Sequence, residues 1–151
     1  MSDLMDLYQE VILDHNKQPR NFGPLADPDR YAEGSNPLCG DELQVFLKLD
    51  GERVAEIRFE GAGCAISTAS ASLMTEAIQG KSVSEIEDLF NGFHEMLTGD
   101  PSVVAQAGEE LGKLAVFSGV REFPVRVKCA TLAWHTLQAA LKGRAKTVST
   151  E

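Results

Sequence analysis

A predicted β-hairpin constrains the fold of this chain more than any other stretch. Every second residue is apolar from Leu43 to Leu49 and again from Ala55 to Phe59, the period of strands with one buried face. Asp50-Gly51 separates the two runs and is a strong hairpin-turn signal. In an antiparallel hairpin, the residues before the first strand and those after the second lie at the same end. The sequence therefore brings these two flanking segments together.

The flanking segments carry two of the three cysteines of the chain. Cys39 lies in the stretch Asn36-Pro37-Leu38-Cys39-Gly40-Asp41, and Cys64 ends the stretch Glu60-Gly61-Ala62-Gly63-Cys64. The third, Cys129, follows Phe123-Pro124-Val125-Arg126-Val127-Lys128 and is far away in sequence. Three thiolates and the Asp41 carboxylate would complete a tetrahedral ligand set for zinc. The fold has to assemble any such site, because the ligands are widely separated along the chain.

Two interpretations of the cysteines are open from the residues alone. No Cys-x-x-Cys pair is present, and isolated cysteines are often small buried hydrophobes. Glycines and polar residues flank Cys39 and Cys64, whereas a core cysteine more often has apolar neighbours. Gly61 and Gly63 can simply end a strand, but a glycine pair beside a thiol favours close approach of the backbone to a ligand. These neighbours favour a metal site.

Helical patterns surround the hairpin. Apolar residues recur at three- and four-residue intervals from Leu4 to Ile12, and a capping box begins at Ser82. Further helices are predicted over residues 103–117 and after both Cys64 and Cys129. Each of these two thiols is then expected near a helix N-terminus, where unpaired N–H groups favour a thiolate.

The predicted fold class is therefore α+β, a small antiparallel β-sheet packed against several α-helices. We expect one domain over residues 1–143 and a flexible polar tail over residues 144–151. The histidines are expected outside the cysteine site, with His15 capping a helix end, His94 as a solvated residue at a helix end and His135 away from the site.

Charge and composition exclude several functions. The 151 residues include 14 Lys and Arg against 23 Asp and Glu, and the resulting net charge of −9 disfavours nucleic acid and anionic membranes as partners. No apolar run has the length of a membrane span, and the acidic N-terminus is unlike a targeting peptide. An odd number of cysteines fits a reducing compartment. We expect a cytoplasmic protein.

Taken together, the motifs resemble one family. The Asn36 to Asp41 stretch, the Phe59 to Ser67 turn, residues 69–72 and the Phe123 to Leu132 stretch are similar to the SufU branch of the IscU/NifU-like iron–sulfur cluster assembly proteins. The resemblance runs from about Leu4 to Leu141. It implies an IscU/NifU N-terminal-like fold.

The resemblance also implies a site and an activity. Cys39, Asp41, Cys64 and Cys129 would bind Zn²⁺, and Cys39 would act as the catalytic thiol that receives persulfide sulfur. The donor would be a SufS-type cysteine desulfurase, which the protein would stimulate, and the sulfur would pass on to the downstream SUF assembly machinery. The implied activity is that of a sulfurtransferase acting with the desulfurase rather than of a stand-alone enzyme.

Two other functions stay open at this point. The same ligands could hold iron or a transient [2Fe–2S] cluster in an assembly scaffold or carrier. The site could also be a structural zinc centre of an interaction domain. Lys128 stands where scaffold-type relatives have a histidine, and a protonated lysine cannot ligate a metal, which favours sulfur transfer. Arg126 and Lys128 could steer or pair with Asp41, or could form solvent-facing ion pairs.

Overall fold

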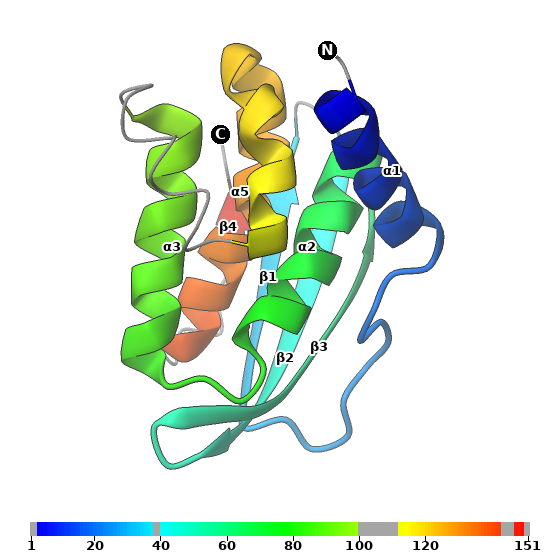
Figure 1. Ribbon diagram of the computed structural model, residues 1–151. Coiled ribbons are helices and arrows are strands. Elements are labelled where there is room, and N and C mark those ends of the chain that lie inside the picture. The colour runs from blue at the N-terminus through cyan, green and yellow to red at the C-terminus, as the bar shows by residue number, and fades with distance from the viewer. Residues whose placement is uncertain (1–2, 38–39, 100–111, 143–146, 150–151) are drawn as a thin grey trace.

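The structure, a computed structural model, describes residues 3–37, 40–99, 112–142 and 147–149. It combines helices with one β-sheet, as the α+β prediction requires (Figure 1). In chain order the elements are α1 (Asp3–Lys17), β1 (Arg30–Asn36), β2 (Asp41–Asp50), β3 (Arg53–Ala62), α2 (Ala65–Ile78), α3 (Val83–Thr98), the 3₁₀ helix η1 (Gly112–Glu122), α5 (Pro124–Leu141) and β4 (Thr147–Ser149).

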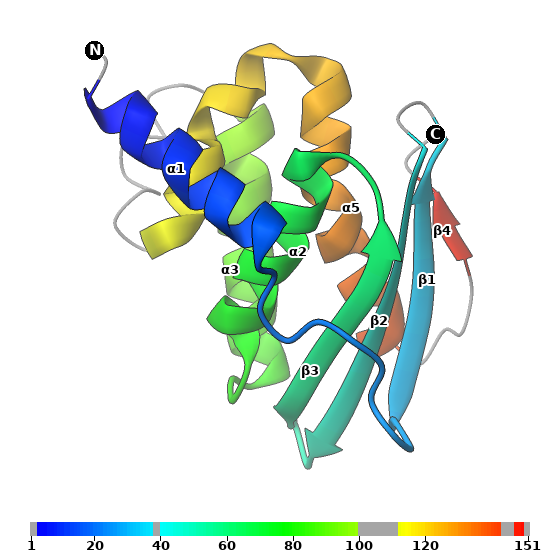
Figure 2. The same cartoon turned by 90° about the vertical axis from the view of Figure 1, so that its right-hand side faces the viewer.

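The sheet has the strand order β3-β2-β1-β4. The three long strands are antiparallel, and β4 runs parallel to β1 at the edge. All the helices lie on one side of this sheet (Figure 2). Buried and more exposed residues alternate along β2, so one face of the sheet packs on the helices and the other faces water.

The predicted hairpin is confirmed, with one shift on its return strand. Asp50 pairs with Arg53 around Gly51, and Leu43, Val45 and Leu47 are buried as expected. On β3, however, Val54 is buried where Ala55 was predicted to be. The pairing register shifts between Lys48 and Leu49, which changes the side of the sheet that the start of β3 presents.

Strand β1 was not predicted, and the reason lies in its inward face. Its buried positions are occupied by Ala32, Gly34 and Asn36, two small residues and a polar one. Alternating hydrophobicity, the signal used to find strands, is therefore missing. A Cβ atom at Gly34 would collide with Thr136 of α5, so the small residues allow this helix to pack closely on β1.

Other segments pair with the outer sides of β3 and β1, the edges of the antiparallel part of the sheet. Asn21 and Gly23 exchange backbone hydrogen bonds with Phe59 at the β3 edge. At the other edge, Thr147–Ser149 pair with β1 inside the tail that was expected to be flexible. Thr and Val are good strand formers, and β1 offers them unpaired backbone groups. Residues 144–146 and 150–151 of that tail lie outside the described residues.

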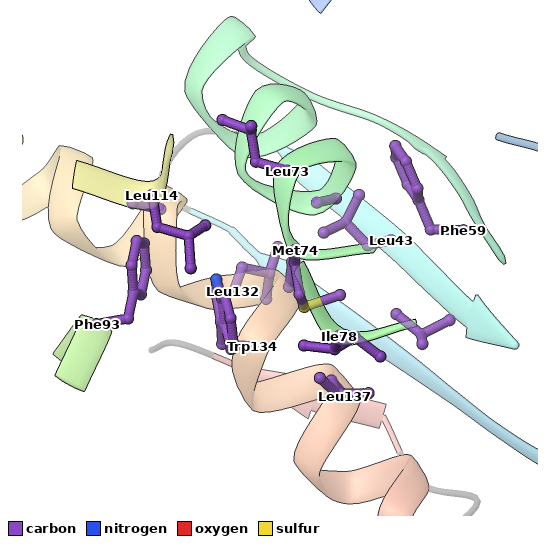
Figure 3. Packing of buried hydrophobic residues seen from close by; sticks show 14 of the residues in the cluster. Leu43, Phe59, Leu73, Met74, Ile78, Phe93, Leu114, Leu132, Trp134 and Leu137 are labelled. Carbon is purple, nitrogen blue, oxygen red and sulfur yellow. The ribbon is translucent and has the colours of Figure 1, made fainter. Parts of the chain in front are cut away.

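The core forms between the sheet and helices α2, α3 and α5 (Figure 3). Trp134 of α5 is fully buried and stacks on Phe93 of α3, with ring centroids 5.0 Å apart. Met74 and Ile78 of α2 join it to the buried residues of the hairpin, among them Leu43. This packing fixes α2 and α5 relative to the end of the hairpin.

The ends of α1 and η1 differ from the prediction. Residues Asp14 to Lys17 continue α1, although a loop was expected to begin there; α1 nevertheless ends before Pro19. Of the helix predicted over 103–117, residues 103–111 lie outside the described part, and η1 continues to Glu122 rather than closing near Gly119. No helix among the described residues combines the length and apolarity that crossing a bilayer requires.

Candidate metal centre

Asp41 places a carboxylate in the interior at the beginning of β2. Its side chain points to the buried face of the sheet and is 1% exposed. Asp41 pairs with Asn36, the last residue of β1, so the two ends of the intervening turn are held together. Within the described residues Asp41 forms no salt bridge. A buried carboxylate without a cationic side chain beside it is a suitable ligand for a metal ion.

Cys64 lies at the same end of the hairpin as Asp41, where β3 passes into α2. It is the N-cap of α2, as the sequence predicted, with φ −71° and ψ 166°. Its Sγ accepts a hydrogen bond from the backbone N–H of Ser67 at 3.4 Å. Its own N–H donates to Asp41 Oδ1 at 2.7 Å, and its Sγ lies 3.8 Å from Asp41 Oδ2. The hairpin therefore brings Asp41 and Cys64 into direct contact.

Cys129 comes from α5, but not from its N-terminus as predicted. Phe123 is extended, as expected before a proline, yet the helix begins directly at Pro124. Cys129 is therefore past the first turn, beyond the unpaired N–H groups. It is 1% exposed, and its Sγ accepts a hydrogen bond from Asn36 Nδ2 at 3.4 Å. A helix N-terminus therefore favours the thiolate form at Cys64, as expected, but not at Cys129.

One ligand atom each from Asp41, Cys64 and Cys129 lies within 4.8 Å of the others. Bond lengths to zinc of about 2.3 Å for sulfur and 2.1 Å for oxygen place tetrahedral S and O ligands about 3.6 Å apart. The 3.8 Å between Cys64 Sγ and Asp41 Oδ2 is close to that separation. The three residues thus fit a zinc ion as a partial ligand set. Cys39, the fourth predicted ligand, lies outside the described residues.

Two glycines allow the strand ends to approach this closely. A Cβ atom at Gly63 would collide with Oδ1 of Asp41, so the absence of a side chain leaves room for the carboxylate. Gly61 has a φ of +141°, and a Cβ there would collide with the backbone of Glu42. Both glycines thus allow close approach between protein segments, and their expected approach to a bound ligand stays a prediction. Asn36 begins the Asn36 to Asp41 stretch, but nothing in the sequence indicated its contacts with Asp41 and Cys129.

An open depression of about 640 Å³ borders the two sulfurs. Cys64 and Cys129 line it together with residues 122–126. Phe123 and Val125 are exposed apolar residues in this stretch. The guanidinium carbon of Arg126 lies 5.2 Å from the ring centroid of Phe123, and Arg126 forms no salt bridge with Asp41 in the described structure. Lys128 is half-buried on the same helix.

The histidines lie away from the cysteine cluster, as predicted, but His15 contacts side chains of α2 instead of capping its helix end as expected. His15 is buried between α1 and α2, where its Nδ1 lies 2.6 Å from Ser72 Oγ. Burial lowers the pKa of His15 below its usual value of 6.5. His94 is exposed on α3, and its ring lies against Phe90, which also contacts His135. Burial, and then the charge of His94, lower the pKa of His135.

The fold and the site define a class of protein: an α+β domain with two cysteines and an aspartate gathered at the end of a β-hairpin, where they could hold a metal ion. A family model described as the NifU-like N-terminal domain matches residues 7–130. The chain belongs to this family, which includes SufU and IscU proteins of iron–sulfur cluster assembly. The predicted family is thereby confirmed.

Relatives of the chain carry two different descriptions. It is 43% identical over 148 residues to the zinc-dependent sulfurtransferase SufU of Bacillus subtilis, covering 96% of this chain and 94% of that protein. It is 42% identical to the iron–sulfur cluster assembly scaffold protein IscU of Streptococcus pyogenes, covering 94% of this chain and 87% of that protein. Sequence identity therefore does not separate the two descriptions.

Solved structures agree with the fold. A candidate iron–sulfur cluster assembly scaffold protein for the SUF system from Fervidobacterium islandicum superposes with a TM-score of 0.78 at 35% identity, covering 93% of this chain and 99% of that one. The N-terminal part of a NifU-like protein from Brucella abortus gives a TM-score of 0.78 at 23% identity, covering 92% and 94%. The predicted IscU/NifU N-terminal-like fold is confirmed.

Proposed function

We propose that this chain is a zinc-dependent sulfurtransferase of iron–sulfur cluster assembly. It would accept persulfide sulfur on Cys39 from a SufS-type cysteine desulfurase and would stimulate that enzyme. The observation that carries the proposal is the convergence of Asp41, Cys64 and Cys129, whose ligand atoms lie within 4.8 Å of one another. The 43% identity to a zinc-dependent sulfurtransferase supports the same activity.

Cys39 would complete the ligand set. It precedes Asp41 by two residues, so the backbone keeps the two Cα atoms within about 7 Å. Three thiolates and one carboxylate oxygen are a ligand combination that tetrahedral zinc accepts. Bound zinc would keep the thiols deprotonated at neutral pH, where free cysteine is largely protonated.

The transfer step is an exchange between a thiolate and a persulfide. The Cys39 thiolate attacks the outer sulfur of the desulfurase persulfide, and a new S–S bond forms as the old one breaks. The desulfurase cysteine leaves as a thiolate and takes up a proton. The sulfur, now carried on Cys39, can pass to the downstream SUF assembly machinery. No external oxidant or reductant is required, because one persulfide replaces another.

Cys64 and Cys129 are less suited to receive the sulfur. Both sulfurs accept N–H hydrogen bonds, from the Ser67 backbone and from Asn36, and such bonds reduce the electron density available for attack. Cys129 is also almost fully buried. Cys39 stands between Pro37 and Gly40 in the sequence, residues that favour a loop over a helix start, and this favours it as the acceptor.

The depression beside the two sulfurs suits a partner protein. Phe123 and Val125 expose apolar surface next to the metal ligands, and exposed apolar residues beside a reactive site are typical of interaction surfaces. Arg126 adds a positive charge to the same surface. We propose that the desulfurase docks here, in the reducing cytoplasm, and delivers its persulfide to Cys39.

An assembly scaffold that binds a transient [2Fe–2S] cluster on the same ligands is the second candidate. The 42% identity to a protein described as an IscU scaffold favours it. Lys128 argues against it, because scaffold-type relatives have a ligating histidine at that position and lysine cannot replace it. Metal analysis separates the two: zinc that iron does not displace supports transfer, and a cluster passed to an apo-acceptor supports the scaffold.

Desulfurase turnover tests the proposal directly. We expect the zinc-loaded chain to increase turnover of a SufS-type enzyme and a folded Cys39→Ser variant to lose that effect. Undiminished stimulation by Cys39→Ser would exclude Cys39 as the acceptor. If stimulation is absent while zinc is bound and the fold is stable, the site is a structural zinc centre instead.

A further inference from the structure

Asn36 contacts two of the metal ligands from a fully buried position. It is the last residue of β1, is 0% exposed and lies opposite Asp41 in the β1–β2 register. Its Nδ2 lies 3.4 Å from Cys129 Sγ and 3.5 Å from Asp41 Oδ2. An amide nitrogen carries two hydrogens, which is one for each of these acceptors.

The carbonyl oxygen of the Asn36 side chain shows why an amide at this position needs an explanation. Asn36 Oδ1 is buried and has no hydrogen-bond partner among the described residues. Burying an unsatisfied carbonyl oxygen is unfavourable, and an apolar residue would avoid that cost. Such a residue would also match Ala32, which is buried on the same face of β1. The contacts of Nδ2 with the two ligands give the amide a use that an apolar side chain lacks.

We infer that Asn36 is a positioning residue of the proposed metal centre, an inference that rests on the proposed function. Its N–H groups would hold Cys129 Sγ and Asp41 Oδ2 toward a common ion. The carboxylate is then held at both oxygens, since the Cys64 N–H donates to Oδ1. Outer hydrogen-bond partners of this kind orient ligands and adjust the charge on them.

Asn36 interacts more strongly with Cys129 than with Asp41. Sulfur is a large atom, so 3.4 Å is an ordinary N–H···S distance, whereas 3.5 Å is long for an N–H···O bond. The donation to Cys129 is therefore the stronger contact. It withdraws electron density from a thiolate that the proposed transfer does not use as an acceptor. Asn36 would thus help to keep Cys129 as a ligand while another cysteine receives the sulfur.

Metal binding by the full chain tests this inference through two variants of Asn36. Asn36→Ala removes the amide and leaves space, whereas Asn36→Leu removes the hydrogen bonds but keeps a side chain of similar size. Ser70→Ala is the matched control, because the Ser70 hydroxyl is buried and donates to Ala130 of α5 without touching a ligand. The readouts are zinc affinity by chelator competition and the thiolate-to-cobalt absorption band of the Co²⁺-loaded protein.

We expect both Asn36 variants to bind zinc about 10- to 100-fold more weakly, the range seen when outer partners of metal ligands are removed. Their cobalt band should move to lower energy, because a thiolate without an N–H donor gives up electron density more easily. Ser70→Ala should match the wild type in both readouts. If Asn36→Leu matches the wild type in zinc affinity and in the cobalt band, the inference is overturned, because the Asn36 side chain would then only fill space.

Three further outcomes bear on the inference. Equal losses in Ser70→Ala would also overturn the inference, because they would show general destabilisation between α2 and α5. If the wild-type chain itself gives no thiolate–cobalt band, the metal centre of the proposed function fails, and this inference fails with it. A normal wild-type spectrum with unchanged Asn36 variants overturns the inference alone.

Discussion

The backbone N–H of Cys64 donates a hydrogen bond of 2.7 Å to Oδ1 of Asp41. This contact joins the beginning of β2 to the residue that caps α2. A single carboxylate therefore has two roles, closing the end of the hairpin through one oxygen and presenting the other toward the sulfurs of the site. The two roles can be separated by mutation.

Asp41→Ala is expected to lower the stability of the fold more than Asp41→Asn does. Both variants are expected to release zinc faster. Asn retains an acceptor for the Cys64 N–H, whereas Ala loses a hydrogen bond to a charged group, worth about 1.5–3 kcal/mol. Both variants remove the charge that would bind the ion, so both should release zinc faster. Denaturant unfolding and zinc release to a chelator measure the two effects. An unchanged zinc off-rate in Asp41→Ala would exclude Asp41 as a ligand.

Gly63→Ala is expected to weaken zinc binding by about tenfold or more, because its Cβ would push Oδ1 of Asp41 away from its position. Gly99→Ala is the matched control, since a Cβ there meets Glu95 at the end of α3, outside the cysteine cluster. Zinc affinity should fall only in the first variant. Equal affinities in the two variants would show that the contact with Asp41 has no role in metal binding.

His15 is expected to make stability depend on pH. Its pKa is lowered in the folded chain by burial and then by Arg20, against opposing effects of Glu76 and Asp14 and a further lowering by Lys113. As the pH falls through 6.5, the unfolded chain takes up a proton that the folded chain does not, so stability decreases toward the lowered pKa. Above that window the contribution is fully present.

His15→Asn should therefore have a smaller loss of stability than the wild type when the pH falls below 6.5. Denaturant midpoints measured across this range, at one zinc concentration, provide the comparison. His135 also has a lowered pKa, so part of the dependence should remain. His135→Asn leaves His15 in place and should retain the part of the dependence that His15 causes, so it serves as the comparison. Identical pH profiles for His15→Asn and the wild type would contradict the prediction.

Val125→Asp is expected to reduce desulfurase stimulation while leaving zinc binding unchanged. Val125 is 50% exposed beside the two sulfurs, and a charge there would oppose burial against a partner. Leu7→Asp is matched in exposure, at 54%, and Leu7 does not line the depression. The concentration of chain that gives half-maximal stimulation should rise only for Val125→Asp. Equal effects of both substitutions would place the docking surface elsewhere.

Local sequence signals were sufficient for the hairpin and for the meeting of its two ends. Asp50-Gly51 specifies the turn, and alternating apolar residues specify which strand faces are buried, so the proximity of Asp41 and Cys64 follows from antiparallel geometry alone. The N-cap position of Cys64 likewise follows from the small residues that begin α2. These features depend on neighbours along the chain.

Only the tertiary structure decided the parts that depend on distant segments. Strand β1 carries no periodic signal, because its inward residues are small or polar where α5 packs against it. Cys129 reaches the site through the packing of α5, from beyond its first turn rather than from its N-terminus. Asn36 becomes part of the site because β1 forms and because α5 packs against it. Sequence determines what lies near in the chain, whereas the burial of helices against the sheet decides which remote side chains share one interior point.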